Sequence, residues 1–227
     1  MNGLKRFIFI LGNFGSGKTE ISINLALDGA EKGRTVLVDM DIINPYFKSS
    51  SKEELLTGKG VRVIKPDYAN TTMDVPTLPA EIYSPFDDKP DRAVFDIGGD
   101  PVGSSVLGLL RDRIREVRDE CDFLMVVNPF RPMQDTPDKI ISLMEEIEAK
   151  AGIRFDGFIS NGNIARETTI DDIYASESIA RELSEEKNIP VYFTAIEESL
   201  SKEYNGENKI FPVHINMRPE WLDNHNI

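Results

Sequence analysis

The sequence is poor in cysteine and histidine, which removes several kinds of chemistry from consideration. A single cysteine, Cys121, excludes an internal disulfide and a four-cysteine metal site within one chain. It comes just before an apolar segment, so we interpret it as buried filler and not as a reactive thiol. The two histidines, His214 and His225, are interpreted as core or surface residues and not as metal ligands. Such sparse cysteine usage predicts a cytoplasmic location.

Long apolar runs and an excess of basic residues are also missing. No stretch reaches the roughly 18 apolar residues of a membrane span, and the apolar N-terminal run is too short for a signal peptide. Asp and Glu number 39 against 26 Lys and Arg, which gives a net charge of −13. Phosphate backbones and anionic lipids repel such a chain, so we predict that neither a nucleic acid nor a membrane is a partner.

The most informative segment that is present is glycine-rich. It reads Gly12-Asn13-Phe14-Gly15-Ser16-Gly17-Lys18-Thr19, follows the apolar run Phe7–Leu11, and precedes a helical pattern over 20–31. This is G-x-x-x-x-G-K-[ST] between a strand and a helix, the context of a phosphate-binding loop (P-loop). Its glycines let backbone N–H groups approach a phosphate chain, and the helix adds its positive dipole end. Lys18 is placed to reach the β- and γ-phosphates, and Thr19 to give its hydroxyl to Mg²⁺.

Carboxylates follow two further apolar segments. Asp39 and Asp41 stand at the end of the first segment, Val36-Leu37-Val38-Asp39-Met40-Asp41. Asp96 stands at the end of the second, shortly before Gly98 and Gly99. Ligands bind at the carboxyl ends of parallel strands, so these side chains are expected beside the P-loop. Simple loop capping is the alternative for the Asp39 and Asp41 pair, and a plain strand-to-helix turn is the alternative for Asp96.

These patterns define the candidate site. We expect Asp96 to act on Mg²⁺ and Gly98 and Gly99 to move with the γ-phosphate. The catalytic candidates are Lys18, Asp41 and Asp39. The metal-binding candidates are Thr19, Asp39 and Asp96. The nucleotide-binding candidates are Gly12, Asn13, Phe14, Gly15, Ser16, Gly17, Lys18, Thr19, Gly99 and Asn161. Switch I is expected over 39–47 and switch II over 96–103.

Alternation of apolar runs with helical patterns predicts the fold. We expect an α/β P-loop NTPase three-layer sandwich, with a mostly parallel sheet and helices on both faces, in one domain over residues 1–227. The expected strands are Phe7–Leu11, Thr35–Met40, Val61–Ile64, Arg92–Ile97, Phe123–Val127, Gly157–Ser160 and Val191–Thr194. The expected helices are Lys18–Lys32, Ser104–Asp119, Thr136–Lys150 and Asp171–Asn188, the last capped by Thr169 and Asp172.

Two segments lack regular periodicity. Lys65–Pro90 carries prolines at 66, 76, 79, 85 and 90, which predicts a long irregular loop that serves as a lid, a binding loop or a mobile segment. The tail from Ser201 to Ile227 is expected to pack back on the domain, because Phe211, Val213, Ile215 and Trp221 are too apolar for a free tail.

The residues from Gly12 to Asp41, and Asp96-Ile97-Gly98-Gly99, resemble the MinD/ParA branch of P-loop proteins (the CobQ/CobB/MinD/ParA nucleotide-binding family). The resemblance implies an ATP-binding, Mg²⁺-dependent ATPase that acts as a nucleotide switch on a protein partner and forms a homodimer around ATP. It also implies that Asn161, with Asn163 second, recognises adenine, although Asn-Gly-Asn is a strong turn sequence too. No Asn-Lys-x-Asp guanine motif follows this strand, so the resemblance favours ATP over GTP.

The chain departs from the family at one position. The signature lysine, which reaches the partner subunit's ATP, is replaced by Asn13, and an amide cannot supply positive charge. Arg131 and Arg166 are candidate substitutes, with surface arginines as the alternative interpretation.

Asn13 also fits a second hypothesis. Dethiobiotin synthetase and the cobyrinic acid amide synthases, which are ATP-dependent carboxylate-activating enzymes, share this loop and lack the lysine. In that case the Lys65–Pro90 segment would be a substrate lid.

Overall fold

A computed structural model describes residues 3–41, 53–66 and 78–216. Its centre is an eight-stranded sheet in the order β3-β2-β4-β1-β5-β6-β7-β8, in which every described pair is parallel. This confirms the expected P-loop NTPase α/β fold. The strands are β1 (Phe7–Leu11), β2 (Thr35–Met40), β3 (Val61–Ile64), β4 (Arg92–Ile97), β5 (Cys121–Val127), β6 (Gly157–Ser160), β7 (Val191–Glu197) and β8 (Ile210–Val213).

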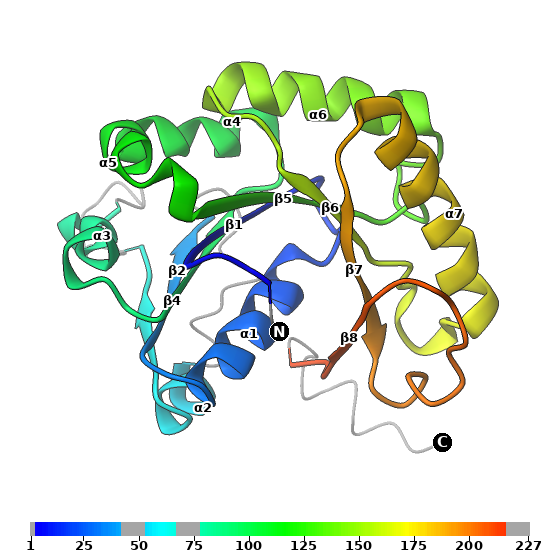
Figure 1. Ribbon diagram of the computed structural model, residues 1–227, viewed down its shortest axis with the longest axis horizontal. Coiled ribbons are helices and arrows are strands. Elements are labelled where there is room, and N and C mark those ends of the chain that lie inside the picture. The colour runs from blue at the N-terminus through cyan, green and yellow to red at the C-terminus, as the bar shows by residue number, and fades with distance from the viewer. Residues whose placement is uncertain (1–2, 42–52, 67–77, 217–227) are drawn as a thin grey trace, which may run out of the picture.

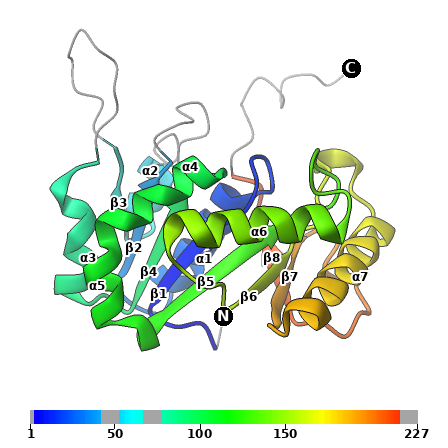
Figure 2. The same cartoon turned by 90° about the horizontal axis from the view of Figure 1, so that it is seen from above.

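Helices cover both faces of this sheet (Figure 1). The α-helices are α1 (Lys18–Ala30), α2 (Glu53–Gly58), α3 (Ser84–Asp88), α4 (Pro101–Ser104), α5 (Arg111–Glu116), α6 (Pro137–Ala151) and α7 (Ile170–Lys187). One face carries α1 and α2, and the other carries α3 to α7 (Figures 1 and 2). Strand β1 shows why both faces are apolar. Phe7 and Phe9 point into the core under α3 to α7, whereas Ile8 and Ile10 point into the core under α1 and α2.

Aromatic stacking organises the larger core. The ring of Phe9 lies 4.5 Å from that of Phe95 and 4.5 Å from that of Phe123, so the three central strands β4, β1 and β5 are joined by stacked side chains. Helix α7 begins as expected, because Thr169 and Asp172 form a capping box. Residues Phe211 and Val213 of β8 are buried, which confirms that this part of the tail packs on the domain; Trp221 lies outside the described residues.

Two expectations were wrong. The single helix expected over 104–119 is instead four short segments, namely α4, a 3₁₀ turn at Ser105–Leu110, α5 and a 3₁₀ turn at Arg118–Glu120. The hydroxyls of Ser104 and Ser105 bond to carbonyls three residues earlier, and Gly108 has low helix propensity, so the tighter turn competes with the α-helix. The helix also starts earlier than expected, since Asp100 caps it and Pro101 occupies its first position.

The second correction concerns the proline-rich segment. Its residues 67–77 lie outside the described part, but Ala80–Tyr83 forms a 3₁₀ turn and Ser84–Asp88 forms α3. Here Pro85 stands at the start of a helix, where its missing N–H is harmless. Phe86 then stacks on Phe7 at 5.1 Å, so this part is core and not an irregular loop.

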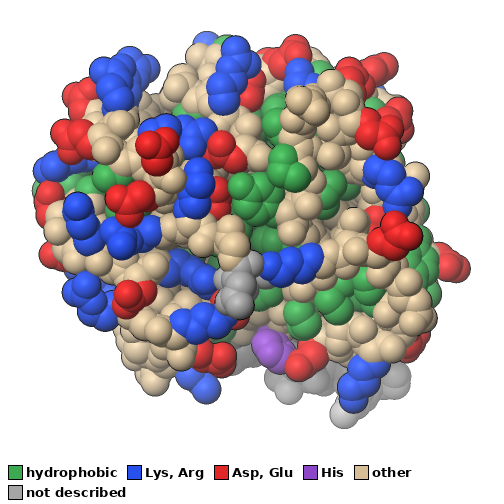
Figure 3. Space-filling view, viewed as in Figure 1, with side chains coloured by type: hydrophobic (Ala, Val, Ile, Leu, Met, Phe, Trp, Pro, Cys, Tyr) green, Lys and Arg blue, Asp and Glu red, His purple; other side chains and the backbone are tan. Residues whose placement is uncertain are grey.

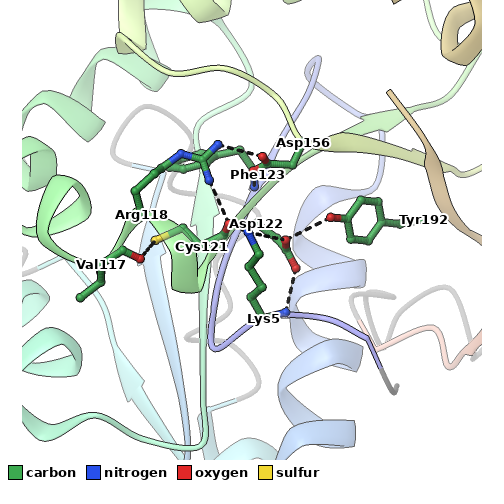
Figure 4. A network of polar contacts seen from close by, with 8 residues as sticks. All are labelled: Lys5, Val117, Arg118, Cys121, Asp122, Phe123, Asp156 and Tyr192. Atoms are coloured by element: carbon green, nitrogen blue, oxygen red, sulfur yellow. Dashed lines mark hydrogen bonds and ion pairs between the residues drawn. The ribbon is translucent and has the colours of Figure 1, made fainter. Parts of the chain in front are cut away.

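Polar contacts tie the amino edge of the sheet together (Figure 4). The buried Asp122 carboxylate accepts the Lys5 backbone N–H at 2.8 Å and the Tyr192 hydroxyl at 3.1 Å. Arg118 donates to Asp156 at 2.8 Å and lies over the Phe123 ring. Burial raises the pKa of the neighbouring Cys121 thiol to about 12, which supports its interpretation as filler. The network therefore fixes the edge opposite the P-loop.

Candidate functional site

The P-loop lies at the carboxyl edge of the sheet, between β1 and α1 (Figure 2). It turns through left-handed backbone at Gly12, Gly15 and Gly17, whose φ angles are 137°, 74° and 97°. A Cβ on Gly12 would stand 2.5 Å from the Val126 carbonyl oxygen, and one on Gly17 would stand 2.2 Å from the Asn161 amide nitrogen. These positions need glycine for space as well as for conformation.

Lys18 begins α1 and is only 6% exposed. Its ammonium donates to the Asn13 carbonyl at 3.0 Å, so this hydrogen bond connects the two ends of the P-loop. Burial lowers the pKa of this ammonium from its usual value, while the negative charges of Asp96 and Asp41 oppose that effect. The two carboxylates outnumber the single buried ammonium, so a polyphosphate bound to Lys18 would need a cation such as Mg²⁺ as well to balance the charge.

The carboxylates expected at this edge come together here. Asp39 and Asp96 are register partners on the neighbouring strands β2 and β4. Burial raises the pKa of Asp96 to about 6, although the charge of Lys18 and a hydrogen bond from Thr19 oppose the rise. The Asp41 backbone N–H donates to the Asp39 carboxylate at 3.0 Å, so Asp39 caps the turn after β2, as its alternative interpretation had it.

The donor set fits a magnesium ion. Thr19 is hydrogen-bonded to Asp96, so a hydroxyl and a buried carboxylate already face one another beside Lys18. Oxygen ligands of this kind suit Mg²⁺, which is held by one or two carboxylates together with water and phosphate oxygens. In the described part of the chain no three His, Cys, Asp or Glu side chains are gathered closely enough to hold a metal by themselves.

The backbone after β4 rests directly on the P-loop. A Cβ on Gly99 would lie 2.6 Å from the Lys18 ammonium nitrogen and 2.8 Å from the Phe14 backbone nitrogen. A Cβ on Gly98 would lie 3.0 Å from the Gly103 Cα and 3.5 Å from the Asp41 carboxylate. The segment expected to be switch II thus contacts the P-loop directly. Beyond Asp41 the segment expected to be switch I lies outside the described residues.

Asn161 is at the carboxyl end of β6 and also touches the P-loop. Its side-chain amide donates to the Ser16 carbonyl at 2.6 Å, and the residue is 6% exposed. The residues after Asn161 form a turn. The Asn163 backbone N–H donates to the Asn161 carbonyl, and the Asn163 side-chain oxygen accepts the Ala165 N–H at 2.8 Å. Asn161 therefore supports the loop, in a position next to where a nucleotide would lie.

Sequence reasoning missed the contacts of Asn13. Its side-chain amide donates to the Pro132 carbonyl at 3.1 Å and its oxygen accepts the Phe14 N–H at 2.8 Å. The P-loop is thereby joined to the segment between β5 and α6. Within that segment, the Asn128 N–H donates to the Gln134 side chain at 3.1 Å. Asn128 directly follows an apolar strand, which is the one signal that could have marked it.

The helix behind the P-loop holds the end of the described chain. Asn24 donates to the His214 carbonyl at 2.9 Å and accepts its N–H at 2.8 Å. Glu20, the residue after Thr19, accepts the Asn216 backbone N–H at 2.6 Å. His214 is paired with Glu198 at 3.2 Å, so it has a partner other than a metal. The side chain of the other candidate cation, Arg166, lies outside the described part.

A separate hollow lies at the amino edge, the face shown in Figure 3. Two adjoining cavities of about 690 and 370 Å³ share the lining residues Ile114, Arg118, Gly152 and Ile153. Basic side chains gather on the left of this face. Arg154 is paired there with Glu148, and Arg118 with Asp156. Its arginines are thus partly neutralised, and it lies on the edge away from the P-loop. Among the described helices none combines the length and apolar character needed to cross a bilayer.

The sequence matches no protein-family profile and no curated protein. Solved structures are similar in fold. FtsY from Mycoplasma mycoides has 17% identity and a TM-score of 0.57 over 86% of this chain and 61% of that one. Chloroplast FtsY from Physcomitrella patens has 17% identity and a TM-score of 0.58 over 86% and 59%. Signal recognition particle 54 kDa protein from Aeropyrum pernix, in complex with GDP, has 15% identity and a TM-score of 0.56 over 86% and 42%.

These comparisons establish the fold. The chain has the P-loop NTPase α/β fold that the FtsY and signal recognition particle structures share. It spans about three fifths of the length of the FtsY structures that it matches.

Proposed function

We propose that this protein binds a magnesium nucleoside triphosphate at the P-loop and hydrolyses it slowly, as a switch that acts on a protein partner. The observation that supports this best is the meeting of Lys18, Asp96 and the backbone of Gly99 at the P-loop. We treat residues 1–227 as one nucleotide-binding domain of the MinD/ParA type, located in the cytoplasm and able to form a homodimer.

Each side chain then has a role set by its chemistry. Lys18 and the loop N–H groups bind the β- and γ-phosphate oxygens and stabilise their charge. Thr19, Asp39 and Asp96 hold Mg²⁺, which neutralises phosphate charge when bound. Asp96 serves as a carboxylate, a state that a neighbouring cation favours. Asp41 orients the attacking water, with Asp39 as the alternative.

We propose adenine as the base, although one similar structure was solved with GDP. Asn161-Gly162-Asn163 follows β6, where the guanine motif Asn-Lys-x-Asp is lacking. The Asn161 amide has donor and acceptor atoms besides the hydrogen given to Ser16, which suits an adenine edge. The contact between Gly99 and the P-loop supports a switch, because a γ-phosphate bonded to Lys18 would have to share this space with switch II.

The deciding experiment is calorimetric titration of wild type and Lys18→Ala with Mg-ATP, Mg-ADP and Mg-GTP. We expect wild type to bind ATP more tightly than GTP and Lys18→Ala to lose measurable binding of all three. The matched control is Lys139→Ala, which removes a surface cation paired with Asp135 and should leave affinity unchanged. Undiminished binding by Lys18→Ala would refute the proposed site. Light scattering of Asp41→Asn with ATP and with ADP then tests nucleotide-dependent dimerisation.

A further inference from the structure

Three buried polar side-chain atoms lack a hydrogen-bond partner in the described part of the chain. They are Ser16 Oγ, Arg131 Nε and Gln134 Nε2. Ser16 belongs to the P-loop, and the other two belong to the segment between β5 and α6 that Asn13 joins to the P-loop. Unsatisfied buried polar atoms are few in native proteins, so three of them in two segments that are joined by a hydrogen bond point to a polar ligand.

Arg131 is held against the P-loop. Its Cδ and Nε lie 3.8 and 3.9 Å from the position of a Cβ on Gly15. Its backbone N–H donates to the Asn128 carbonyl and its carbonyl accepts from the Gln134 N–H, both at 3.1 Å. The next residue, Pro132, accepts from Asn13. Backbone contacts on both sides therefore fix the backbone that carries Arg131, and among the described residues no carboxylate pairs with its guanidinium.

Its charge has no counterpart among the described residues. Within them the Arg131 guanidinium forms no ion pair, and the nearest carboxylate in its segment, Asp135, is paired with Lys139 at 2.8 Å. A guanidinium nitrogen that is buried without an acceptor costs free energy, which an anion would recover. The planar fork of arginine matches phosphate oxygens in particular, because it can donate two parallel hydrogen bonds.

We propose that Arg131 contacts the terminal phosphate of the nucleotide bound by the P-loop of its own chain. It supplies the positive charge that Asn13 cannot, and it makes the site prefer a triphosphate to a diphosphate. This inference rests on the proposed function and adds to it the residue that distinguishes the two states of the switch. Asn13 then acts through its contact with Pro132, as a positioning residue for the segment that carries Arg131.

The test compares two nucleotides that differ in the terminal phosphate. Mg-ADP and a non-hydrolysable Mg-ATP analogue are titrated into wild type, Arg131→Ala, Arg131→Lys and Arg115→Ala. We expect Arg131→Ala to reduce the preference for the analogue over ADP by about 10- to 100-fold, the range of one or two charge-assisted hydrogen bonds. Arg131→Lys should restore part of it. Arg115, an exposed arginine on α5, should leave the preference unchanged.

The outcomes separate this inference from the function on which it rests. An unchanged ratio in Arg131→Ala, with binding lost in Lys18→Ala, overturns the role of Arg131 and leaves the nucleotide site standing. Equal loss of ADP and analogue affinity in Arg131→Ala also overturns it, because that result means damage to the P-loop. Intact nucleotide binding by Lys18→Ala defeats both proposals.

Discussion

A Cβ added to Gly99 would stand 2.6 Å from the ammonium nitrogen of Lys18. The segment after β4 and the P-loop lysine are therefore in direct contact, although they are far apart in sequence. Under the proposed function, a phosphate bonded to Lys18 would therefore lie close to the backbone at Gly99.

Gly99→Ala should weaken nucleotide binding. The added methyl would also stand 2.8 Å from the Phe14 backbone nitrogen, which cannot move aside as easily as the lysine side chain. Overpacking of this kind costs about 1–3 kcal/mol, so we expect affinity to fall about 5- to 150-fold. Gly108→Ala is the matched control, because nothing lies within 4 Å of its added Cβ. Equal affinities for the two variants would contradict the prediction.

Asn161→Ala should change base preference. Removal of the amide breaks the bond to the Ser16 carbonyl, which costs about 1 kcal/mol for every nucleotide, and it also removes the proposed contact with adenine. Affinity for Mg-ATP should therefore fall more than affinity for Mg-GTP. Titration with both nucleotides measures the ratio, and Asn163→Ala serves as the comparison. If both affinities fall by the same factor, Asn161 only supports the P-loop.

Asp28 makes stability depend on acid pH. Burial alone would raise the pKa of this carboxyl, but hydrogen bonds from Lys32 at 2.7 Å and Arg92 at 2.6 Å hold it well below its usual value. The stabilisation is present above the unfolded pKa near 4 and is lost as pH falls through the folded pKa. Asp28→Asn should therefore lower the free energy of unfolding by about 1–2 kcal/mol at pH 7.

That difference should shrink as the pH is lowered below 4. Urea unfolding of both proteins at pH 7 and pH 3 measures it, with Asp135→Asn as a control for an exposed surface pair. A difference between wild type and Asp28→Asn that is the same at both pH values would rule out the ion pair as its source.

Cys121 should be inert in the native protein. Its pKa is raised to about 12 by burial, so almost no thiolate forms at neutral pH, and the side chain is fully covered. We expect alkylation by iodoacetamide at pH 8 to follow the unfolding equilibrium and to accelerate sharply in urea. Fast labelling in buffer, at the rate of a free thiol, would show that the amino edge opens locally.

Local patterns predicted most of the sheet. Phe7–Leu11 and Arg92–Ile97 were foreseen at their observed bounds, because strands that are covered on both faces are continuous apolar runs. Strand β8 was missed, since its four residues include Pro212 and pair only at the edge of the sheet. The breaks between Pro101 and Glu120 were missed because serine and glycine decide between α and 3₁₀ turns through single hydrogen bonds.

The site shows the same division. The P-loop and Asp96 were predicted because each motif is contiguous and ends an apolar strand. The hydrogen bond from Asn13 to Pro132 joins residues that are distant in sequence, and no local sequence pattern predicts it. Arg131 was named only as a cation after a strand, and its unpaired buried nitrogen became visible only when the P-loop and the segment after β5 were placed together.

The bond between Glu20 and Asn216 has a mechanical consequence. Glu20 is adjacent in sequence to Thr19, the proposed magnesium ligand. Asn216, the last described residue, is therefore hydrogen-bonded one residue away from that ligand. Thr19 and Glu20 both lie in the first turn of helix α1. A displacement of this turn would therefore also move the contact between Glu20 and Asn216. A spectroscopic label beyond residue 216 would then report ligand binding at the P-loop without touching it.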